Sequence, residues 1–185
     1  AELQTVIGKA EDPVNDMKMI LNKYDYLQEF PQKVMEEVKR FSQKSIAQEI
    51  SNRRDLREWT SFTIDPVDAK DFDDAISIKQ NRNGYELGVH IADVSHFVEQ
   101  NTYIDREAIQ RSTSVYFTEG VVHMLPEALS ANLCSLRPNE DRLAVSAIMK
   151  MDKDFNIMEK EILPTVINSK ARFTYQDVQD IVEDK

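Results

Sequence analysis

The chain has 185 residues, of which 41% are hydrophobic and 30% are charged, a balance that is typical of a folded globular domain and argues against disorder. Its formal net charge of −10 makes nucleic acid a less expected partner without excluding it, since phosphate contacts depend on lysine and arginine. A single cysteine, Cys134, cannot form an internal disulfide, which predicts a reducing, cytoplasmic compartment. No apolar run approaches the roughly 18 residues of a membrane span, so no membrane partner is expected.

The first 60 residues predict helices that are rich in charge. Asn15 or Asp16 is expected to cap a first helix, because apolar residues at helical spacing follow them. Pro31 is expected in the first turn of a second helix, whose apolar stripe reaches Phe41. We interpret both stripes as packing surfaces. The four glycines form no Walker or dinucleotide-binding pattern, so no nicotinamide or flavin cofactor is expected.

From residue 61 the pattern changes to strands and turns. The turn signal NRNG, at 81–84, predicts a hairpin whose second strand is buried through Leu87, Val89 and Ile91. The further predicted elements are strands at 61–64 and 74–79, a helix opened by a capping box of Thr102 and Asp105, extended segments at 115–117 and 121–125, a short helix at 126–132, paired strands at 143–152 and 156–166, and a terminal helix at 175–183. Because strands and helices are interspersed without strict alternation, the predicted fold class is α/β, a mixed sheet with flanking helices.

One stretch, FTIDPVDAKDFDDAISI at residues 62–78, is unusually acidic. It holds five aspartates within ten positions, namely Asp65, Asp68, Asp71, Asp73 and Asp74. Carboxylates so close together repel one another unless solvent, salt or a bound cation screens them. Apolar residues on both sides draw the ends of the turn into the core, and Mg²⁺ or Mn²⁺ prefers oxygen ligands, which favours a metal site. The alternative is a solvated acidic loop, since aspartate is common in turns.

Three rival acidic motifs do not fit this stretch. A calcium-binding EF-hand loop that starts at Asp71 needs Gly and Glu where Ile76 and Arg82 stand. The phosphatase pattern DxDxT fails because Ala75 occupies the threonine position. A zinc site lacks a cysteine or histidine nearby.

Two further groups of residues leave their roles open. The three histidines, His90, His96 and His123, stay unassigned, because a lone histidine is more often a core or surface residue than a ligand. Basic and aromatic residues that suit phosphates and bases flank the acidic stretch, namely Arg53, Arg54, Arg57, Arg106, Arg111, Tyr116 and Phe117. Ordinary ion pairs and core aromatics are an equally open interpretation of them.

The chain resembles the catalytic RNB domain of the ribonuclease II/ribonuclease R family, and ribonuclease R more closely. Four successive segments carry the resemblance: FTIDPVDAKDFDDAISI, LGVHIADVSHFV, IDREAIQRSTSVYF and HMLPEALSANLCSLRPNEDRL. It implies a fragment in which residues 51–185 are the N-terminal part of the catalytic domain. Residues 1–50 then correspond to a helical linker that follows a cold-shock-type RNA-binding domain.

The resemblance implies a processive exoribonuclease that hydrolyses single-stranded RNA from its 3′ end to nucleoside 5′-monophosphates by a two-metal-ion mechanism, with Mg²⁺ or Mn²⁺ as cofactor. The family signature Asp-Pro-x-x-Ala-x-Asp-x-Asp-Asp places the metal ligands at Asp65, Asp71, Asp73 and Asp74 and the catalytic role at Asp73 and Asp74. Tyr116 resembles the family's RNA-stacking tyrosine. Asp68 inherits no role.

Two other functions stay open beside this one. The first is a non-catalytic RNA-binding or scaffolding module with a vestigial acidic site, and the second is a metal-dependent phosphohydrolase of another substrate. The resemblance also implies that a catalytic arginine and an aromatic base clamp lie beyond Lys185. We therefore expect this fragment to hold metal poorly and to be inactive alone.

Overall fold

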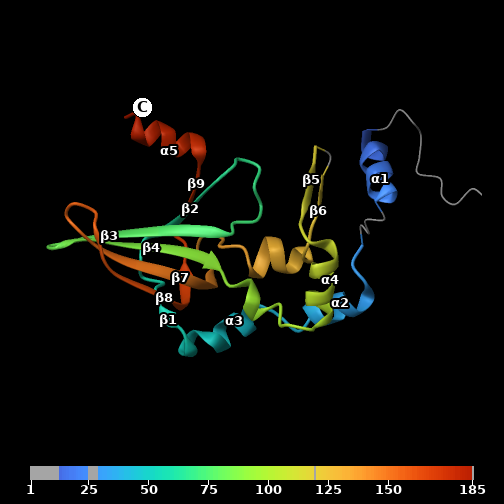
Figure 1. The fold of residues 1–185 in the computed structure, drawn as a ribbon, viewed down its shortest axis with the longest axis horizontal. Helices are drawn as coiled ribbons and strands as arrows, with labels where there is room; N and C mark the ends of the chain where they lie inside the picture. Colours follow the sequence, from blue (N-terminus) through green and yellow to red (C-terminus); the bar gives the residue numbers. More distant parts are fainter. Residues whose placement is uncertain (1–12, 25–28, 119, 185) are drawn as a thin grey trace, which may run out of the picture. The chain divides into compact units, whose positions relative to one another are not determined.

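The computed structural model describes residues 13–24, 29–118 and 120–184 (Figure 1). They divide into two units, and neither unit is continuous in the sequence. The smaller unit combines the described residues of Ala1–Lys39 with those of Glu99–Pro126, and the larger unit combines Arg40–Val98 with the described residues of Glu127–Lys185. The sequence analysis placed a domain boundary near residue 50, between a linker and a catalytic domain of a longer protein. The two units do not test this boundary, which stays a prediction.

The smaller unit is built from three helices and a two-stranded hairpin among its described residues, namely α1 (Pro13–Lys23), α2 (Gln32–Val38), α4 (Tyr103–Arg111), β5 (Val115–Phe117) and β6 (Gly120–Val122). α2 packs on α4, where the buried carboxylate of Glu37 accepts the N–H of Ile104 at 2.9 Å. Thr102 caps α4 as predicted, but Asp105 accepts the N–H of Asn101 instead of completing the capping box.

The start of α1 differs from the prediction. The helix begins at Pro13, so Asn15 and Asp16 lie within its first turn and do not cap it. Proline suits a first helical position, because its fixed φ fits the helix and its missing N–H would have no partner there. Pro31, expected inside the first turn of α2, is the residue that directly precedes this helix.

The larger unit is a mixed sheet of seven strands among the described residues, in the order β1-β8-β7-β4-β3-β2-β9. The strands are β1 (Arg54–Asp55), β2 (Ser61–Asp65), β3 (Asp74–Asn81), β4 (Gly84–Ala92), β7 (Asp141–Asp152), β8 (Ile157–Asn168) and β9 (Ala171–Thr174). β1 runs parallel to β8 and β9 parallel to β2, whereas the four pairs between them are antiparallel. The predicted α/β mixed sheet is confirmed, as are the β3–β4 hairpin and the β7–β8 pair (Figure 1).

The helices of this unit are α3 (Gln43–Glu49), the single 3-10 turns η1 (Ile50–Asn52) and η2 (Val94–His96), the π-helix η3 (Leu129–Leu133) and α5 (Tyr175–Val182). η3 overlaps the short helix predicted at 126–132, and α5 confirms the predicted terminal helix. The described residues include no helix that is long and apolar enough to cross a membrane.

The buried face of β4 is the opposite of the predicted one. Gly88, His90 and Ala92 point into the unit, while Ile91 on the other face is 50% exposed. Gly88 is required because a Cβ there would lie 2.5 Å from the Ser77 hydroxyl and 2.8 Å from the His90 ring. The prediction failed because it placed the apolar residues inside, whereas this part of the sheet buries a hydrogen-bonded polar row.

Candidate functional site

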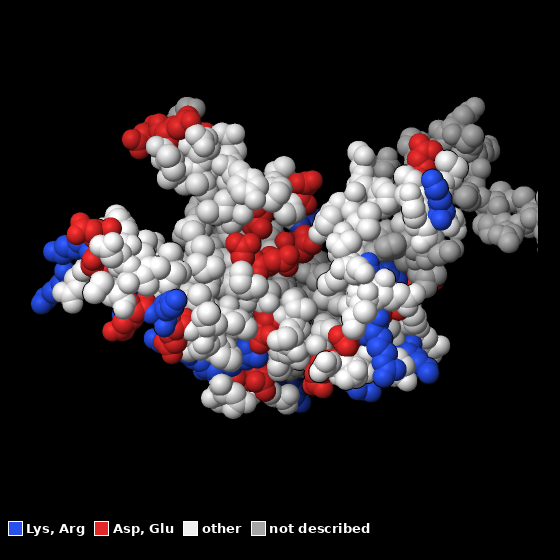
Figure 2. Space-filling model, in the orientation of Figure 1, with Lys and Arg blue, Asp and Glu red and all other residues white. Residues whose placement is uncertain are grey.

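The acidic stretch forms a turn between β2 and β3, and we call residues 65–74 the acidic turn. Asp65 is the last residue of β2 and pairs with Thr174 of β9, and Asp74 is the first residue of β3 and pairs with Ile91 of β4. The sheet therefore fixes the backbone of both end carboxylates, while Asp71 lies in the connection between the strands. Figure 2 shows a group of acidic side chains on this face, where Figure 1 has the segment between β2 and β3.

The four signature carboxylates lie close enough to influence one another electrostatically. Asp73 is exposed at the surface, but partial desolvation raises its pKa, and the charges of Asp71, Asp74 and Asp65 raise it further. Burial also raises the pKa of Asp65, with Asp74 and Asp71 adding to the effect, while the Thr63 hydroxyl and the Arg172 guanidinium oppose it. Negative charge thus accumulates in the acidic turn beyond what the fold compensates.

One carboxylate oxygen makes the case for a cation. Asp65 is 7% exposed, and its Oδ2 is buried. The neighbouring Thr63 hydroxyl lowers the pKa of this carboxyl, but neither that hydroxyl nor Oδ2 makes a hydrogen bond of ordinary geometry. An unpartnered buried acceptor of this kind costs free energy, more so when it is charged. A hard divalent ion would satisfy this oxygen, and oxygen ligands are what Mg²⁺ and Mn²⁺ prefer.

The four carboxylates do not converge on one point. Within the ranges that the structure describes, no three acidic, histidine or cysteine side chains are arranged as a ready metal site. The donor set fits Mg²⁺ chemically, but the side chains have to rotate toward one another to share an ion.

The backbone of the acidic turn is held from two sides. Arg172 of β9 donates to the carbonyls of Pro66 and Val67, at 2.6 and 2.9 Å. At the other end, the segment after η3 contacts Phe72, whose N–H donates to the Ser135 hydroxyl at 2.9 Å. None of these supporting residues was singled out from the sequence, because they lie 63 or more residues from the turn.

The cysteine lies in this supporting segment. Burial raises the pKa of the Cys134 thiol to about 12, and the nearby charge of Asp73 adds to the rise. A thiol of this kind stays protonated and unreactive at neutral pH. Cys134 is therefore a core residue beneath the acidic turn and not a nucleophile.

Most of the arginines that were candidates for phosphate binding are engaged in ion pairs. Arg53 is paired with the buried Asp93 at 2.7 Å, and Arg111 is paired with the buried Glu107 at 2.8 Å. The pKa of Asp93 lies below its usual range, since hydrogen bonds from Ser95 and Arg53 outweigh the opposing effect of burial. The ion-pair interpretation, left open in the sequence, therefore holds for these residues, and likewise for Arg54 with Glu161 and for Arg57 with Asp55 and Asp141.

The histidines are not gathered around the acidic turn. His90 is fully buried in the sheet, where burial lowers its pKa to about 4. His96, in η2, makes an edge contact with the Phe97 ring. His123 belongs to the smaller unit, and its Nδ1 is buried without a hydrogen-bond partner. His90 is thus a hydrogen-bonded core residue, which the sequence analysis took to be more frequent than a ligand.

Tyr116, the residue expected to stack on RNA, lies on β5 of the smaller unit and is 63% exposed. Its ring is accessible for stacking against a base, and a stacked base typically contributes about 1–3 kcal/mol. The four aspartates belong to the larger unit.

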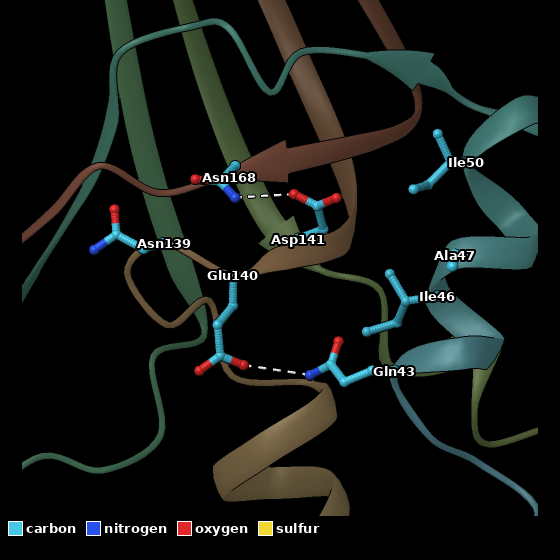
Figure 3. A pocket seen from close by; sticks show the side chains of 8 residues that line it. All are labelled: Gln43, Ile46, Ala47, Ile50, Asn139, Glu140, Asp141 and Asn168. Carbon is cyan, nitrogen blue, oxygen red and sulfur yellow. Dashed lines mark hydrogen bonds between the residues drawn. The ribbon is translucent and has the colours of Figure 1, made fainter.

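A cavity of about 490 Å³ lies elsewhere in the larger unit, beside α3 and the ends of β7 and β8 (Figure 3). Its acidic groups are already paired, because Glu140 accepts from Gln43 and Arg142, and Asp141 accepts from Asn168. None of the signature aspartates lines it. The cavity therefore presents no uncompensated charge and is a weaker candidate than the acidic turn.

Comparison with known proteins identifies the family of the chain. Residues 53–185 match the RNB domain family. Ribonuclease R of Chlamydia trachomatis is 48% identical over 97% of this chain and 26% of its own length, so the chain spans about a quarter of such curated relatives. Mycoplasma genitalium RNase R, solved in complex with double-stranded RNA, superimposes with a TM-score of 0.89 at 35% identity over 98% of this chain and 32% of that one. Yeast Ssd1, a pseudonuclease, shares the fold with a TM-score of 0.77 at 22% identity over 96% of this chain and 23% of that one.

Proposed function

The chain belongs to the RNB domain family, and we propose that the protein containing it is a 3′-to-5′ exoribonuclease that hydrolyses single-stranded RNA processively to nucleoside 5′-monophosphates. The observation that carries the proposal is the acidic turn, where four mutually repelling carboxylates include a buried oxygen without a hydrogen-bond partner. The similarity to ribonuclease R, including solved complexes of a relative with RNA, supports RNA as the substrate. A cytoplasmic location is part of the same proposal.

Asp65, Asp71, Asp73 and Asp74 are the residues that would hold Mg²⁺, or Mn²⁺ in its place. When bound, the two ions neutralise phosphate oxygens and lower the pKa of the attacking water. The sheet fixes the backbone of Asp65 and Asp74, so that side-chain rotation is the movement these two residues need to reach an ion. Tyr116 would stack on a base and keep the RNA strand in register.

A non-catalytic module with a vestigial site is the second candidate. Its support is the fold of Ssd1, which shows that this architecture also occurs in a pseudonuclease. The fold alone therefore does not decide between the two functions, and the side chains must. This chain retains all four signature aspartates, and the described residues leave Asp65 Oδ2 unpartnered. That costly arrangement favours a retained cation site over a vestigial one.

The test uses the full-length protein and the variant Asp73→Asn, with Asp68→Asn as its matched control. Asp68 is an exposed residue of the same turn and has no signature role. Asp73→Asn should reduce hydrolysis of labelled single-stranded RNA at least a hundredfold, because it removes a metal-facing charge, while RNA binding measured by gel shift persists. Asp68→Asn should retain the wild-type rate.

Substrate and metal controls separate the three candidate functions. The wild type should digest RNA in Mg²⁺ or Mn²⁺, leave DNA and small phosphoesters intact, and lose activity in EDTA. A near-native rate for Asp73→Asn, or no RNA hydrolysis by the full-length protein in either metal, would overturn the proposal. Preferential cleavage of small phosphoesters would favour the general phosphohydrolase.

A further inference from the structure

Phe72, the residue between Asp71 and Asp73, has both of its backbone groups bound by one distant segment. Its N–H donates to the Ser135 hydroxyl at 2.9 Å, and its carbonyl accepts the N–H of Leu136 at 2.8 Å. The Ser135 hydroxyl in turn faces the Lys70 carbonyl at 3.5 Å. The second half of the acidic turn is therefore attached to residues 135–136 at each of these points.

This attachment point is itself rigid. Ser135 is fully buried, and its carbonyl accepts from Nε of Arg142 at 2.7 Å. Arg142 is 1% exposed, lies on the inner strand β7 and is paired with Glu140 at 2.6 Å. The hydrogen bonds thus run without a break from the sheet, through Arg142 and Ser135, to the backbone between two of the signature aspartates.

The ring of Phe72 reinforces the same attachment. It is 8% exposed and belongs to the core cluster that also contains Leu136, Trp59 and Ile148. With the backbone bound at both groups and the ring in the core, the φ and ψ angles of Phe72 are restricted. Those two angles set the relative directions in which Asp71 and Asp73 leave the backbone.

From this geometry we infer that Ser135 is a positioning residue, which holds the backbone between Asp71 and Asp73 so that their side chains can rotate onto a shared metal ion. The inference rests on the proposed function and adds a residue to it that touches neither metal nor substrate. Two carboxylates that flank one residue repel each other, so an unattached turn would relax to a wider arrangement. Outer contacts that orient ligands in this way typically account for a 10- to 100-fold difference in metal affinity.

The test compares Ser135→Ala with Ser169→Ala in the full-length protein. Ser169 is a matched control because it is also buried, and its hydroxyl donates to the carbonyl of Ala171 and not to the acidic turn. Amide hydrogen exchange of the peptide covering residues 70–74 should accelerate about tenfold in metal-free Ser135→Ala and stay unchanged in Ser169→Ala. Mn²⁺ affinity, followed by the EPR signal of the free ion, should fall about tenfold in Ser135→Ala alone.

RNA kinetics supply a third measurement. Ser135→Ala should lower kcat and raise the Mg²⁺ concentration for half-maximal rate, with KM for RNA unchanged. If both serine variants lower Tm alike and neither alters exchange at 70–74 or Mn²⁺ affinity, Ser135 has only a structural role and the inference is wrong. If the wild type itself binds no Mn²⁺, the proposed metal site is wrong, and so is the role of Ser135 toward a metal. If hydrogen exchange at residues 70–74 is unchanged in Ser135→Ala, the attachment of the turn through Ser135 is wrong, whereas the metal site still stands.

Discussion

Two groups of polar side chains in the larger unit differ in how completely their polar atoms are paired. One is the acidic turn. The other is a row across the sheet formed by Ser77 of β3, His90 of β4, Ser146 of β7 and Thr165 of β8, which we call the histidine row. The histidine row is buried and satisfies each of its polar atoms. In the acidic turn Asp65 is buried while Asp73 and Asp74 are exposed, and the buried Asp65 oxygen stays unpaired.

The histidine row is a closed chain of hydrogen bonds. His90 Nε2 lies 2.9 Å from the Ser77 hydroxyl and Nδ1 lies 2.6 Å from that of Ser146, which contacts Thr165 Oγ1 at 2.6 Å. Thr165 donates to the carbonyl of Ala144, so a neutral His90 with its proton on Nδ1 satisfies every member. The acidic turn, by contrast, retains charge and an unpartnered Asp65 oxygen. A fully paired row stabilises the fold, whereas an incompletely paired charged group indicates a binding site.

The largest expected effect on stability comes from breaking the row with His90→Leu. The substitution leaves the hydroxyls of Ser77 and Ser146 without their shared partner in a site with no access to solvent. The Ser146 hydroxyl keeps its bond to Thr165, so the Ser77 hydroxyl is the group left unpaired. The free energy of unfolding should therefore fall by about 1–3 kcal/mol, the usual cost of one unpaired buried group. Denaturant unfolding measures the loss. RNA hydrolysis by the remaining folded protein should be unaffected, and a lost activity would mean that the row also supports the acidic turn.

The two groups should also give stability opposite dependences on pH. His90 binds a proton near pH 6.5 when unfolded and near pH 4 when folded, so the unfolded state holds more protons between these values. The free energy of unfolding therefore falls as pH drops through this window, by up to about 3 kcal/mol from His90. Asp65 and Asp73, whose pKa values are raised by folding, act in the opposite direction, because protonation relieves their repulsion.

Variants separate these two contributions in unfolding measurements between pH 4 and pH 7. His90→Gln should flatten the decline on acidification, since the buried group no longer titrates. Asp73→Asn should steepen it, because one compensating carboxyl is gone. A steeper decline in His90→Gln would contradict the assignment of a neutral buried imidazole.

The smallest expected effect is a gain in stability. In the absence of metal, Asp73→Asn should raise Tm slightly, because it removes one of four mutually repelling charges. Adding Mg²⁺ should raise Tm of the wild type by a few degrees, as expected for an ion that binds only the folded state, and should raise it less in the variant. Calorimetry with and without Mg²⁺, with Asp68→Asn as the control, measures both shifts. A variant that is less stable without metal would show that the turn is not strained by its own charge.

Local chemistry made much of this molecule predictable. Alternating residues and the NRNG turn identify the β3–β4 hairpin, Thr102 identifies the start of α4, and the clustered aspartates identify the acidic turn. Each of these depends on residues within a few positions of one another. The sequence also shows that the arginines and His90 can form ion pairs or hydrogen bonds, but it does not show which residues they pair with.

Only the tertiary structure decided what surrounds these elements. It buried the His90 face of β4, paired Arg53 with Asp93, and attached Phe72 to Ser135, 63 residues farther along the chain. Such contacts follow from the order of strands in the sheet, which no local pattern specifies. The sequence by itself therefore determined which carboxylates form the candidate site, whereas the fold determined how they are held, because a side chain carries its chemistry with it but obtains its partners only when distant segments pack together.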